Sequence, residues 1–375
     1  MSEVTGLELR STVDGEGVLT LNLEPVTLSP PADDEVIVRV EAAPINPSDL
    51  GLLLGAADVT TLEEAGDADR PVLRFRVPRE RIGGVKARIG QSLAVGNEGA
   101  GTVVAAGASA EGLHGRKVGM IGGGMFAEYR KLKARDVVPL PAGASAADGA
   151  AMFVNPLTAL AFAETAKAGG HRAIVHTAAA SNLGQMLQKI CLADGLALVN
   201  IVRSDAQEAI LREIGATIVV NSKAEDFRAR LTDAIAESGA TIGFDAIGGG
   251  TLASDIVQSM EQAANRTATE YSRYGSNTFK ELYIYGALDT GPTTLNRMAF
   301  GFQWSISGFL LFPWLQKAGP EVAARMRQRI LAELTTTFAS RYTATIGLRE
   351  ALKPEVLRAY ERKTTGEKYL IDPTR

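Results

Sequence analysis

One segment of the chain combines residue types and a spacing that could bind a phosphate group. Residues 174–185 read IVHTAAASNLGQ, an apolar run followed by small residues and then by apolar residues at helical spacing. A turn that joins a strand to a helix in this way can bind pyrophosphate through backbone N–H groups at the helix N-terminus. Of the glycines in the usual G-x-G-x-x-G pattern only the third is present, with small residues in the other two positions. An ordinary strand-to-helix turn is the alternative. The residues expected to contact a dinucleotide are Ala179, Ser181, Asn182, Leu183 and Gly184.

A second candidate for nucleotide recognition follows the next expected strand. In dinucleotide-binding folds the residue about 20 positions after the turn contacts the adenosine ribose, and an acidic residue there binds the 2′-hydroxyl of NAD. This chain has Arg203 there, followed by Ser204. A guanidinium group suits the 2′-phosphate of NADP, because it forms paired hydrogen bonds with phosphate oxygens. We therefore expect NADP(H), with a solvated arginine at a strand end as the alternative. Asp205 is a rival for the ribose but is expected to cap the following helix.

These residues lie in a part of the chain, from about residue 148, where short apolar runs alternate with helical patterns. Helical spacing is found from Leu183 to Cys191 and from Phe227 to Ile235. Residues 204–207 read as the capping box of a helix that ends at Gly215. Such alternation is typical of a doubly wound parallel sheet with right-handed crossovers. The runs expected to form strands are 173–176, 196–202, 217–220, 242–247 and 282–287.

The first third of the chain has a different pattern. Residues 35–41 (EVIVRVE) alternate polar and apolar side chains, as a half-buried strand does, and Pro44 and Pro47 predict a loop after them. Four glycines between residues 96 and 107 predict a strand with tight bends. We expect an antiparallel β-rich barrel or sandwich here, and a final strand near residues 368–371.

The composition is that of a globular chain with no strong charge imbalance. The 375 residues include 39 Lys and Arg and 43 Asp and Glu, a formal net charge of −4, and 46% are hydrophobic. This balance does not predict nucleic acid or an anionic membrane as a partner. Cys191 is the single cysteine, so no intrachain disulfide is possible, and no run reaches the about 18 apolar residues of a membrane span. The first ten residues include Glu3 and Glu8 and lack the apolar run of a secretory signal, so we expect no such signal and a cytoplasmic location.

Two stretches read as insertions into these patterns. Residues 58–91 are rich in arginine, and residues 264–280 contain Tyr271, Arg273 and Tyr274. A charged run is usually a solvated surface. A substrate-binding or dimer-facing element is the alternative for both stretches.

Several segments occur in an order that resembles a known family. They are VIVRVEAAPINPSD at 36–49, GNEGAG at 96–101, NPLTA at 155–159, the turn at 178–185, SGFL at 307–310 and TGEK at 365–368. Together they resemble the medium-chain dehydrogenase/reductase superfamily, in its zinc-independent quinone oxidoreductase-like branch. The turn is similar to the variant found in enoyl-thioester reductases of the same superfamily. The resemblance covers nearly the whole chain.

This resemblance implies an α/β protein made of a Rossmann domain with a doubly wound parallel sheet and a β-rich, GroES-like catalytic domain. We place the catalytic domain at residues 1–147 and 313–375 and the dinucleotide-binding domain at residues 148–312. The resemblance also implies an active-site cleft between the domains and a homodimer paired through an edge strand of the cofactor domain.

The resemblance further implies residues near the nicotinamide. Asn46 would face the nicotinamide pocket from the catalytic domain and is the candidate catalytic residue, with turn formation beside Pro47 as the alternative. The other residues implied to contact NADP(H) are Asn155, Thr158, Ile247, Gly248, Gly286, Ala287 and Leu288.

The chain departs from two patterns of this superfamily. Zinc-dependent members need a Cys/His ligand set, but this chain has one Cys and three His. We expect His176 and Cys191 to be buried, and no metal site. Enoyl-thioester reductases carry a tyrosine shortly after the Asn-Pro-x-Asp loop, whereas residues 50–59 (LGLLLGAADV) contain none.

Without a Lewis acid, hydride transfer needs an acceptor that is already electrophilic. We therefore expect a zinc-independent, NADPH-dependent oxidoreductase that reduces a quinone or an α,β-unsaturated carbonyl compound. One alternative is an enoyl-thioester reductase, and another is a nucleotide-binding protein with little turnover. Tyr271 and Tyr274 are the residues considered as proton donors, with surface or dimer packing as the alternative.

Overall fold

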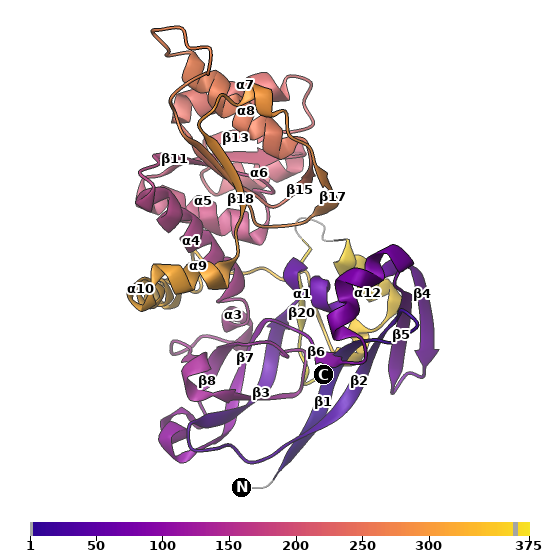
Figure 1. Cartoon of the computed structure of the whole chain (residues 1–375). Coiled ribbons are helices and arrows are strands. Elements are labelled where there is room, and N and C mark those ends of the chain that lie inside the picture. Colours follow the sequence, from indigo (N-terminus) through magenta and orange to yellow (C-terminus); the bar gives the residue numbers. More distant parts are fainter. Residues whose placement is uncertain (1–2, 363–366) are drawn as a thin grey trace. The chain divides into compact units, whose positions relative to one another are not determined.

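The chain divides into two compact units in this computed structural model, which describes residues 3–362 and 367–375 (Figure 1). The first unit comprises Met1–Val154 and Glu333–Arg375, and the second Asn155–Ala332. The second boundary falls later than the expected position at 312/313, because α9 (Leu311–Ala318) and α10 (Pro320–Ala332) pack on the second unit. Trp314 on α9, for example, donates to Thr165 Oγ1 at 2.9 Å. Thr365 and Gly366 of the TGEK segment lie outside the described residues.

Sheets dominate the described part of the first unit, where all neighbouring strands except β19 and β20 run antiparallel. One sheet has the order β4 (Asp58–Gly66), β5 (Pro71–Arg76), β2 (Val18–Leu28), β1 (Val4–Val13) and β6 (Ser92–Ala94). The other has the order β10 (Val137–Pro139), β8 (Lys117–Ile121), β7 (Glu98–Ala106), β3 (Glu35–Pro44), β20 (Tyr369–Ile371) and β19 (Ala344–Ile346), and β9 (Tyr129–Lys133) also pairs with β3. Short helices complete the unit: α1 (Pro47–Leu53), α2 (Ile82–Val85), α3 (Ala146–Gly149), α11 (Leu348–Ala351) and α12 (Pro354–Glu361).

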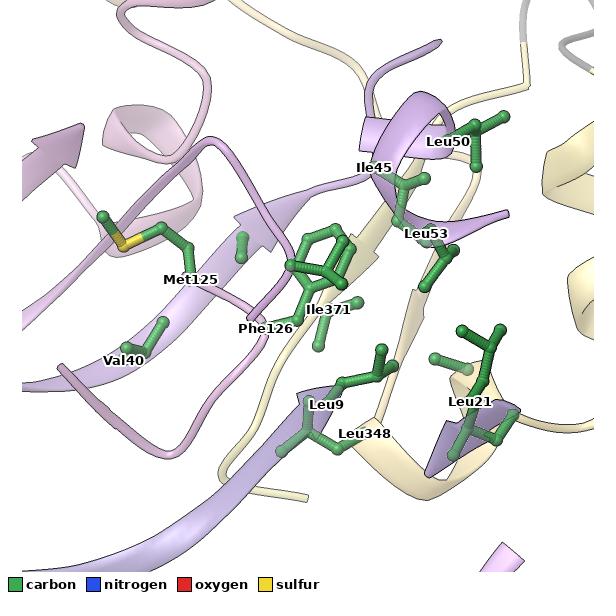
Figure 2. Packing of buried hydrophobic residues seen from close by; sticks show 14 of the residues in the cluster. Leu9, Leu21, Val40, Ile45, Leu50, Leu53, Met125, Phe126, Leu348 and Ile371 are labelled. Carbon is green, nitrogen blue, oxygen red and sulfur yellow. The ribbon is translucent and has the colours of Figure 1, made fainter. Parts of the chain in front are cut away.

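The buried core of the first unit positions α1, which follows the Asn-Pro-Ser-Asp loop. Leu50 and Leu53 of α1 pack beside Ile45 and the core residues of both sheets (Figure 2). The arginine-rich insertion supports the same helix, because Arg88 donates to the Leu52 carbonyl at 3.0 Å. The insertion begins with the β4–β5 hairpin at the edge of the first sheet and continues into α2. Its other basic side chains are exposed: Arg70, Arg74, Arg76, Arg79, Arg81 and Lys86.

The second unit is described throughout and contains a parallel sheet. Its order is β13 (Ile218–Asn221), β12 (Ala197–Val202), β11 (Ala173–His176), β14 (Ile242–Asp245), β16 (Lys280–Ile284) and β18 (Trp304–Gly308). The chain starts in the middle at β11, moves outward to β13, and then returns to β14 and moves outward in the other direction. The strand order therefore reverses between β11 and β14. The helices between the strands are α5 (Asn182–Asp194), α6 (Asp205–Glu213), α7 (Phe227–Ser238) and α8 (Leu252–Asn265), and α4 (Val154–Ala168) precedes β11.

Helices cover both faces of this sheet because its strands are apolar on both sides. Val175 of β11 packs with Leu231 of α7 and Ile256 of α8. On the opposite face Phe162 of α4 stacks on Phe244 of β14 with ring centroids 3.9 Å apart. The predicted fold class, a doubly wound α/β sheet with a β-rich unit, is confirmed. In the part of the chain that the structure describes, no helix is both long and apolar enough to cross a membrane.

Three strands of the second unit were not expected from the sequence. β15 (Gly248–Gly250) and β17 (Asp289–Thr293) pair with each other outside the main sheet, and β18 forms its outer edge. β15 consists of three glycines and β17 contains a Gly-Pro pair, and both residue types are depleted in strands.

Candidate functional site

The reversal of strand order marks the carboxyl ends of β11 and β14 as the candidate ligand position of the second unit. In open α/β sheets, ligands bind at this switch point. β11 ends at His176, and the turn at 177–181 leads directly into α5. β14 ends at Asp245, and a loop follows it at the same edge. The predicted phosphate-binding turn therefore lies where the topology places a ligand.

The turn before α5 has a strained backbone and a very close packing contact. Ala178 has φ 49°, and it is the one non-glycine residue among those described with a positive φ. The left-handed position is thus Ala178 rather than Ala179, which the sequence pattern had matched to the first glycine. A Cβ atom added to Gly184 would lie 2.1 Å from the Ala179 carbonyl oxygen. Only glycine permits this approach of the helix to the turn, which is the packing role of the third glycine in the fingerprint.

The N-terminus of α5 opens beside this turn. Ser181 is the N-cap, and its hydroxyl accepts the Gly184 N–H at 3.1 Å. Asn182 and Leu183 form the first helical residues, where the helix dipole and backbone N–H groups favour an anion. The Ser181 hydroxyl is engaged in this cap, so the turn would contact a phosphate chiefly through its backbone.

A buried carboxylate organises the loop after β14. Asp245 accepts hydrogen bonds from the Thr177 hydroxyl at 2.7 Å, from the Ile247 N–H at 2.9 Å and from the Gly248 N–H at 3.1 Å. Thr177 Oγ1 in turn accepts the Ala246 N–H at 2.8 Å. Asp245 therefore ties the end of β14 to the end of β11. Sequence reasoning missed it, because an aspartate before a glycine run is an ordinary strand end.

The loops after β14 and β16 lie against each other. A Cβ on Gly286 would lie 2.5 Å from the Ala246 carbonyl oxygen, and one on Gly248 would lie 2.9 Å from the Gly286 carbonyl oxygen. The Leu288 N–H donates to the Ala246 carbonyl at 3.2 Å. The structure thus brings together all five residues expected to flank the nicotinamide in this unit, namely Ile247, Gly248, Gly286, Ala287 and Leu288.

The other predicted cofactor contacts occupy the ends of two further elements. Arg203 is exposed directly after β12, and Ser204 caps α6 by accepting the Gln207 N–H. Asn155 is half-buried and Thr158 is buried in the first turn of α4. Because residues 169–172 reverse the chain between α4 and β11, the first turn of α4 points toward the carboxyl end of the sheet.

Asn46 belongs to a buried polar cluster in the first unit. Its Nδ2 donates to Glu98 Oε1 at 2.8 Å, and its N–H donates to Asp49 Oδ2 at 2.7 Å. Glu98 also accepts the Phe153 and Val154 N–H groups at 2.8 and 2.9 Å. Asn46 is thus both the N-cap of α1 and a partner of a buried acid.

Burial without full charge compensation shifts the titration of this cluster. Desolvation raises the pKa of Asp49 to about 7 and also raises the pKa of Glu98. Desolvation lowers the pKa of the buried Lys368, whose positive charge acts on both carboxylates. The ammonium lies 5.7 Å from the ring centroid of Tyr342. The sequence had marked the segments that hold Glu98 and Lys368, but nothing in one segment indicates that it meets the other.

The remaining candidates are accounted for by packing. His176 is fully buried and lies 2.8 Å from the Tyr285 hydroxyl through Nε2, and desolvation lowers its pKa to about 3. Cys191 is buried, as expected. Tyr271 is 93% exposed, and Tyr274 packs edge-on against Phe302. No group of three or more His, Cys, Asp or Glu residues that could hold a metal was found within residues 3–362 and 367–375.

Residues 32–142 match the alcohol dehydrogenase GroES-like domain family. A protein of Mesorhizobium loti assigned as an NADPH:quinone reductase has a similar structure, with a TM-score of 0.72 and 27% identity over 100% of this chain and 99% of that one. The domain match and this structural likeness agree with the medium-chain dehydrogenase/reductase superfamily. The resemblance inferred from the sequence is thereby confirmed.

Within this superfamily the chain is similar to proteins of more than one named activity. A mitochondrial enoyl-[acyl-carrier-protein] reductase of Xenopus tropicalis is 30% identical over 220 residues, which are 56% of this chain and 54% of that protein. The chain thus spans about half the length of this curated relative. The complex of Etr1p with NADP and crotonyl-CoA shares the fold, with a TM-score of 0.70 and 19% identity over 98% of this chain and 100% of that one.

Proposed function

We propose that this chain is an NADPH-dependent reductase that transfers hydride to an already electrophilic acceptor, a quinone or an α,β-unsaturated carbonyl compound. The observation that carries the proposal is the contact of Gly184 with the Ala179 carbonyl at the switch point of the sheet. This close contact leaves space at the N-terminus of α5, and a pyrophosphate group suits that position. The names of the similar proteins, which include an NADPH:quinone reductase and a complex with NADP, support the choice of cofactor.

Different residues around this turn would hold different parts of the cofactor. The turn before α5 would hold the pyrophosphate, and Arg203 with Ser204 would hold the adenosine 2′-phosphate. Asn155 and Thr158 would contact the cofactor from the first turn of α4. The paired glycine loops fixed by Asp245 would support the nicotinamide ring through Ile247, Gly248 and residues 286–288. The bound cofactor supplies the hydride, and the chain supplies position and electrostatics.

Asn46 is the proposed catalytic residue on the first unit. Its amide is held by Glu98, and Asn46 Oδ1 is buried without a hydrogen-bond partner among the described residues. A buried polar atom without a partner favours binding of a ligand that supplies one. Among the described residues no group of His, Cys, Asp and Glu could hold a metal. The proposed acceptors are electrophilic without a Lewis acid.

An enoyl-thioester reductase is the second candidate, favoured by the 30% identity to the enoyl reductase of Xenopus tropicalis. The lack of a tyrosine in residues 50–59 counts against it. The test is an NADPH-oxidation screen over quinones, enones and enoyl thioesters. Faster turnover of quinones or enones supports the first candidate, and faster turnover of a crotonyl thioester supports the second. NADPH binding without turnover of any acceptor would contradict both and favour a nucleotide-binding protein.

The same proposal includes a homodimer paired through β18. β18 is the outer strand of the parallel sheet, and an unpaired edge of this kind can join the same edge of a second copy. Large apolar side chains beside this strand are exposed by 59–67%: Phe302, Leu310 and Phe312. Light scattering should give a dimer, and Leu310→Asp should shift it to a monomer. A monomeric wild type would contradict the pairing. A cytoplasmic location stays a prediction from the sequence.

A further inference from the structure

Lys368 and Asn46 lie just beyond the paired ends of β20 and β3, in positions that continue their register. β20 runs antiparallel to the end of β3, and the pairing continues to Ile45, whose N–H donates to the Tyr369 carbonyl at 2.9 Å. Asn46 keeps an extended backbone, with φ −97° and ψ 154°. One further step in this register brings Lys368 opposite Asn46. Directly opposite residues of an antiparallel pair have side chains on the same face, so the ammonium group and the amide share one side of the sheet.

The Lys368 side chain is fixed in a buried position. Its backbone N–H donates to Thr343 Oγ1 at 3.1 Å, and its carbonyl accepts the Thr343 N–H at 2.8 Å. The residue is 7% exposed, and Nζ has no hydrogen-bond partner among the residues that are described. A buried ammonium without an acceptor is unfavourable unless nearby negative charge compensates for its lost hydration.

That negative charge comes from two elements packed around Lys368. Asp49 on α1 and Glu98 on β7 are both buried, and the charge of Lys368 lowers the pKa of each against the opposite effect of burial. The remaining ionisable groups here are Tyr342, whose ring lies below the ammonium, and Asp148 on α3, which acts on Tyr342. Lys368 is therefore the positive charge that faces both buried carboxylates.

The ionisation of Glu98 decides how the Asn46 amide is oriented. An ionised carboxylate only accepts hydrogen bonds, so Asn46 must turn Nδ2 toward it and leave Oδ1 free. A protonated Glu98 could instead donate to Asn46 Oδ1 and hold the amide in the flipped orientation. In the structure Asn46 Nδ2 faces Glu98, which is the orientation that an ionised Glu98 requires.

We propose that Lys368 is a positioning residue: its positive charge keeps Glu98 an acceptor, and through Glu98 it holds the Asn46 amide with its oxygen free for a hydrogen-bond donor on the cofactor or the substrate. Only the last step rests on the proposed function. The link from Lys368 to Glu98 concerns the first unit alone and can be tested without turnover.

The first test compares pH profiles of kcat/KM for the wild type, Lys368→Met and Lys368→Arg. Removal of the positive charge raises the pKa of Glu98, so activity should be lost at a higher pH as the medium is acidified. We expect the acidic limb of Lys368→Met to move upward by about one pH unit or more, and Lys368→Arg to restore it. Lys353→Met, at an exposed lysine of the same unit, is the control. An acidic limb that stays in place in Lys368→Met would overturn the proposal.

A double-mutant cycle separates positioning from direct contact with the reacting groups. If Lys368 acts through Glu98, Lys368→Met should change kcat/KM by less than about twofold when Glu98→Gln is already present. If the two changes multiply to their full separate effects, Lys368 acts on the reaction by another route and the proposal is wrong.

The third test needs no activity, so it separates failure of this inference from failure of the proposed function. The unfolding free energy of Lys368→Met relative to the wild type is measured across the neutral and mildly acidic range. The variant should be most destabilised at high pH and should approach the wild type as the carboxylates become protonated. Glu98→Gln should reduce this pH dependence. A difference that does not vary with pH would overturn the inference, and Lys368→Gln serves if Lys368→Met does not fold.

Discussion

The Asn46 side chain donates a 2.8 Å hydrogen bond to Glu98 in the interior of the first unit, where Asn46 is 2% exposed and Glu98 is fully buried. This bond joins the N-cap of α1 to the first residue of β7. It joins two sequence motifs, residues 36–49 and 96–101, in one buried polar site of the first unit. The hydrogen bonds that meet at Glu98 are therefore the natural targets for mutation.

Glu98→Gln should destabilise the chain by about 1–3 kcal/mol. Glu98 accepts N–H groups on both of its oxygens. A glutamine oxygen would accept these N–H groups more weakly than a carboxylate does, and the glutamine nitrogen would be paired only if the Asn46 amide flips. Urea denaturation measures the change, with the exposed Glu355→Gln as the control. Equal stability of Glu98→Gln and the wild type would show that these hydrogen bonds contribute nothing net.

Asp49 should make the wild type lose stability as the pH rises toward neutrality. Its folded pKa of about 7 exceeds the usual 3.8, so the folded state binds the proton more tightly than the unfolded state. The stabilisation is complete below the unfolded pKa and is lost as the pH rises through about 7, with a slope of at most about 1.4 kcal/mol per pH unit. The stability of the wild type relative to Asp49→Asn, followed by denaturation, should fall over that window. A rise with pH would contradict the assignment.

Arg203→Ala should reduce the preference for NADPH over NADH by roughly 10- to 150-fold, the range for a hydrogen bond to a charged group worth ~1.5–3 kcal/mol. Ser204 can retain part of the phosphate contact, so we expect the lower end. The measurement is the ratio of kcat/KM for the two cofactors, with the exposed Arg230→Ala as the control. If the wild type prefers NADH, Arg203 is a solvated residue at a strand end.

Gly184→Ala should weaken NADPH binding and destabilise the second unit by about 1–3 kcal/mol. The added Cβ would lie 2.1 Å from the Ala179 carbonyl, so α5 and the turn must move apart. Fluorescence titration with NADPH and thermal denaturation give the two values. Gly83→Ala, where a Cβ meets nothing within 4 Å, is the matched control. Wild-type NADPH affinity in Gly184→Ala would refute the role of this turn.

The second insertion depends on a buried ion pair between Glu261 of α8 and Lys280 of β16. Glu261 also accepts the Ser276 N–H at 2.8 Å and the Ser276 hydroxyl at 2.6 Å, which anchors the insertion. Lys280→Met alone should cost about 3–5 kcal/mol, because it leaves a buried carboxylate without its partner. The double variant with Glu261→Leu should recover part of the loss in urea denaturation. No recovery would mean that the pair itself is strongly stabilising.

The arrangement of strands and helices around the nucleotide turn was readable from the sequence because it is local. Each strand of the βαβ pattern is a short apolar run followed by a helix with periodic apolar residues. The role of Gly184 was readable for the same reason. The left-handed conformation of Ala178 was not, because alanine has no sequence signature for a positive φ.

The polar cluster of the first unit could not be assembled from the sequence, because its members meet only through tertiary structure. Lys368 comes close to Glu98 and Asp49 through the pairing of β20 with β3, which joins the two ends of the chain. Asp245 was overlooked for a related reason, since its partner Thr177 follows another strand, 68 residues earlier in the chain. Periodicity predicts which elements form, but it does not predict which buried polar groups they bring into contact.

The most direct test of the account is the stoichiometry of NADPH oxidation and acceptor reduction by the purified wild type, with and without a metal chelator. We predict that one NADPH is oxidised for each quinone or enone reduced, at a rate that the chelator does not change. NADPH that binds but is oxidised by no acceptor, or activity that is lost together with a stoichiometric metal, would contradict it.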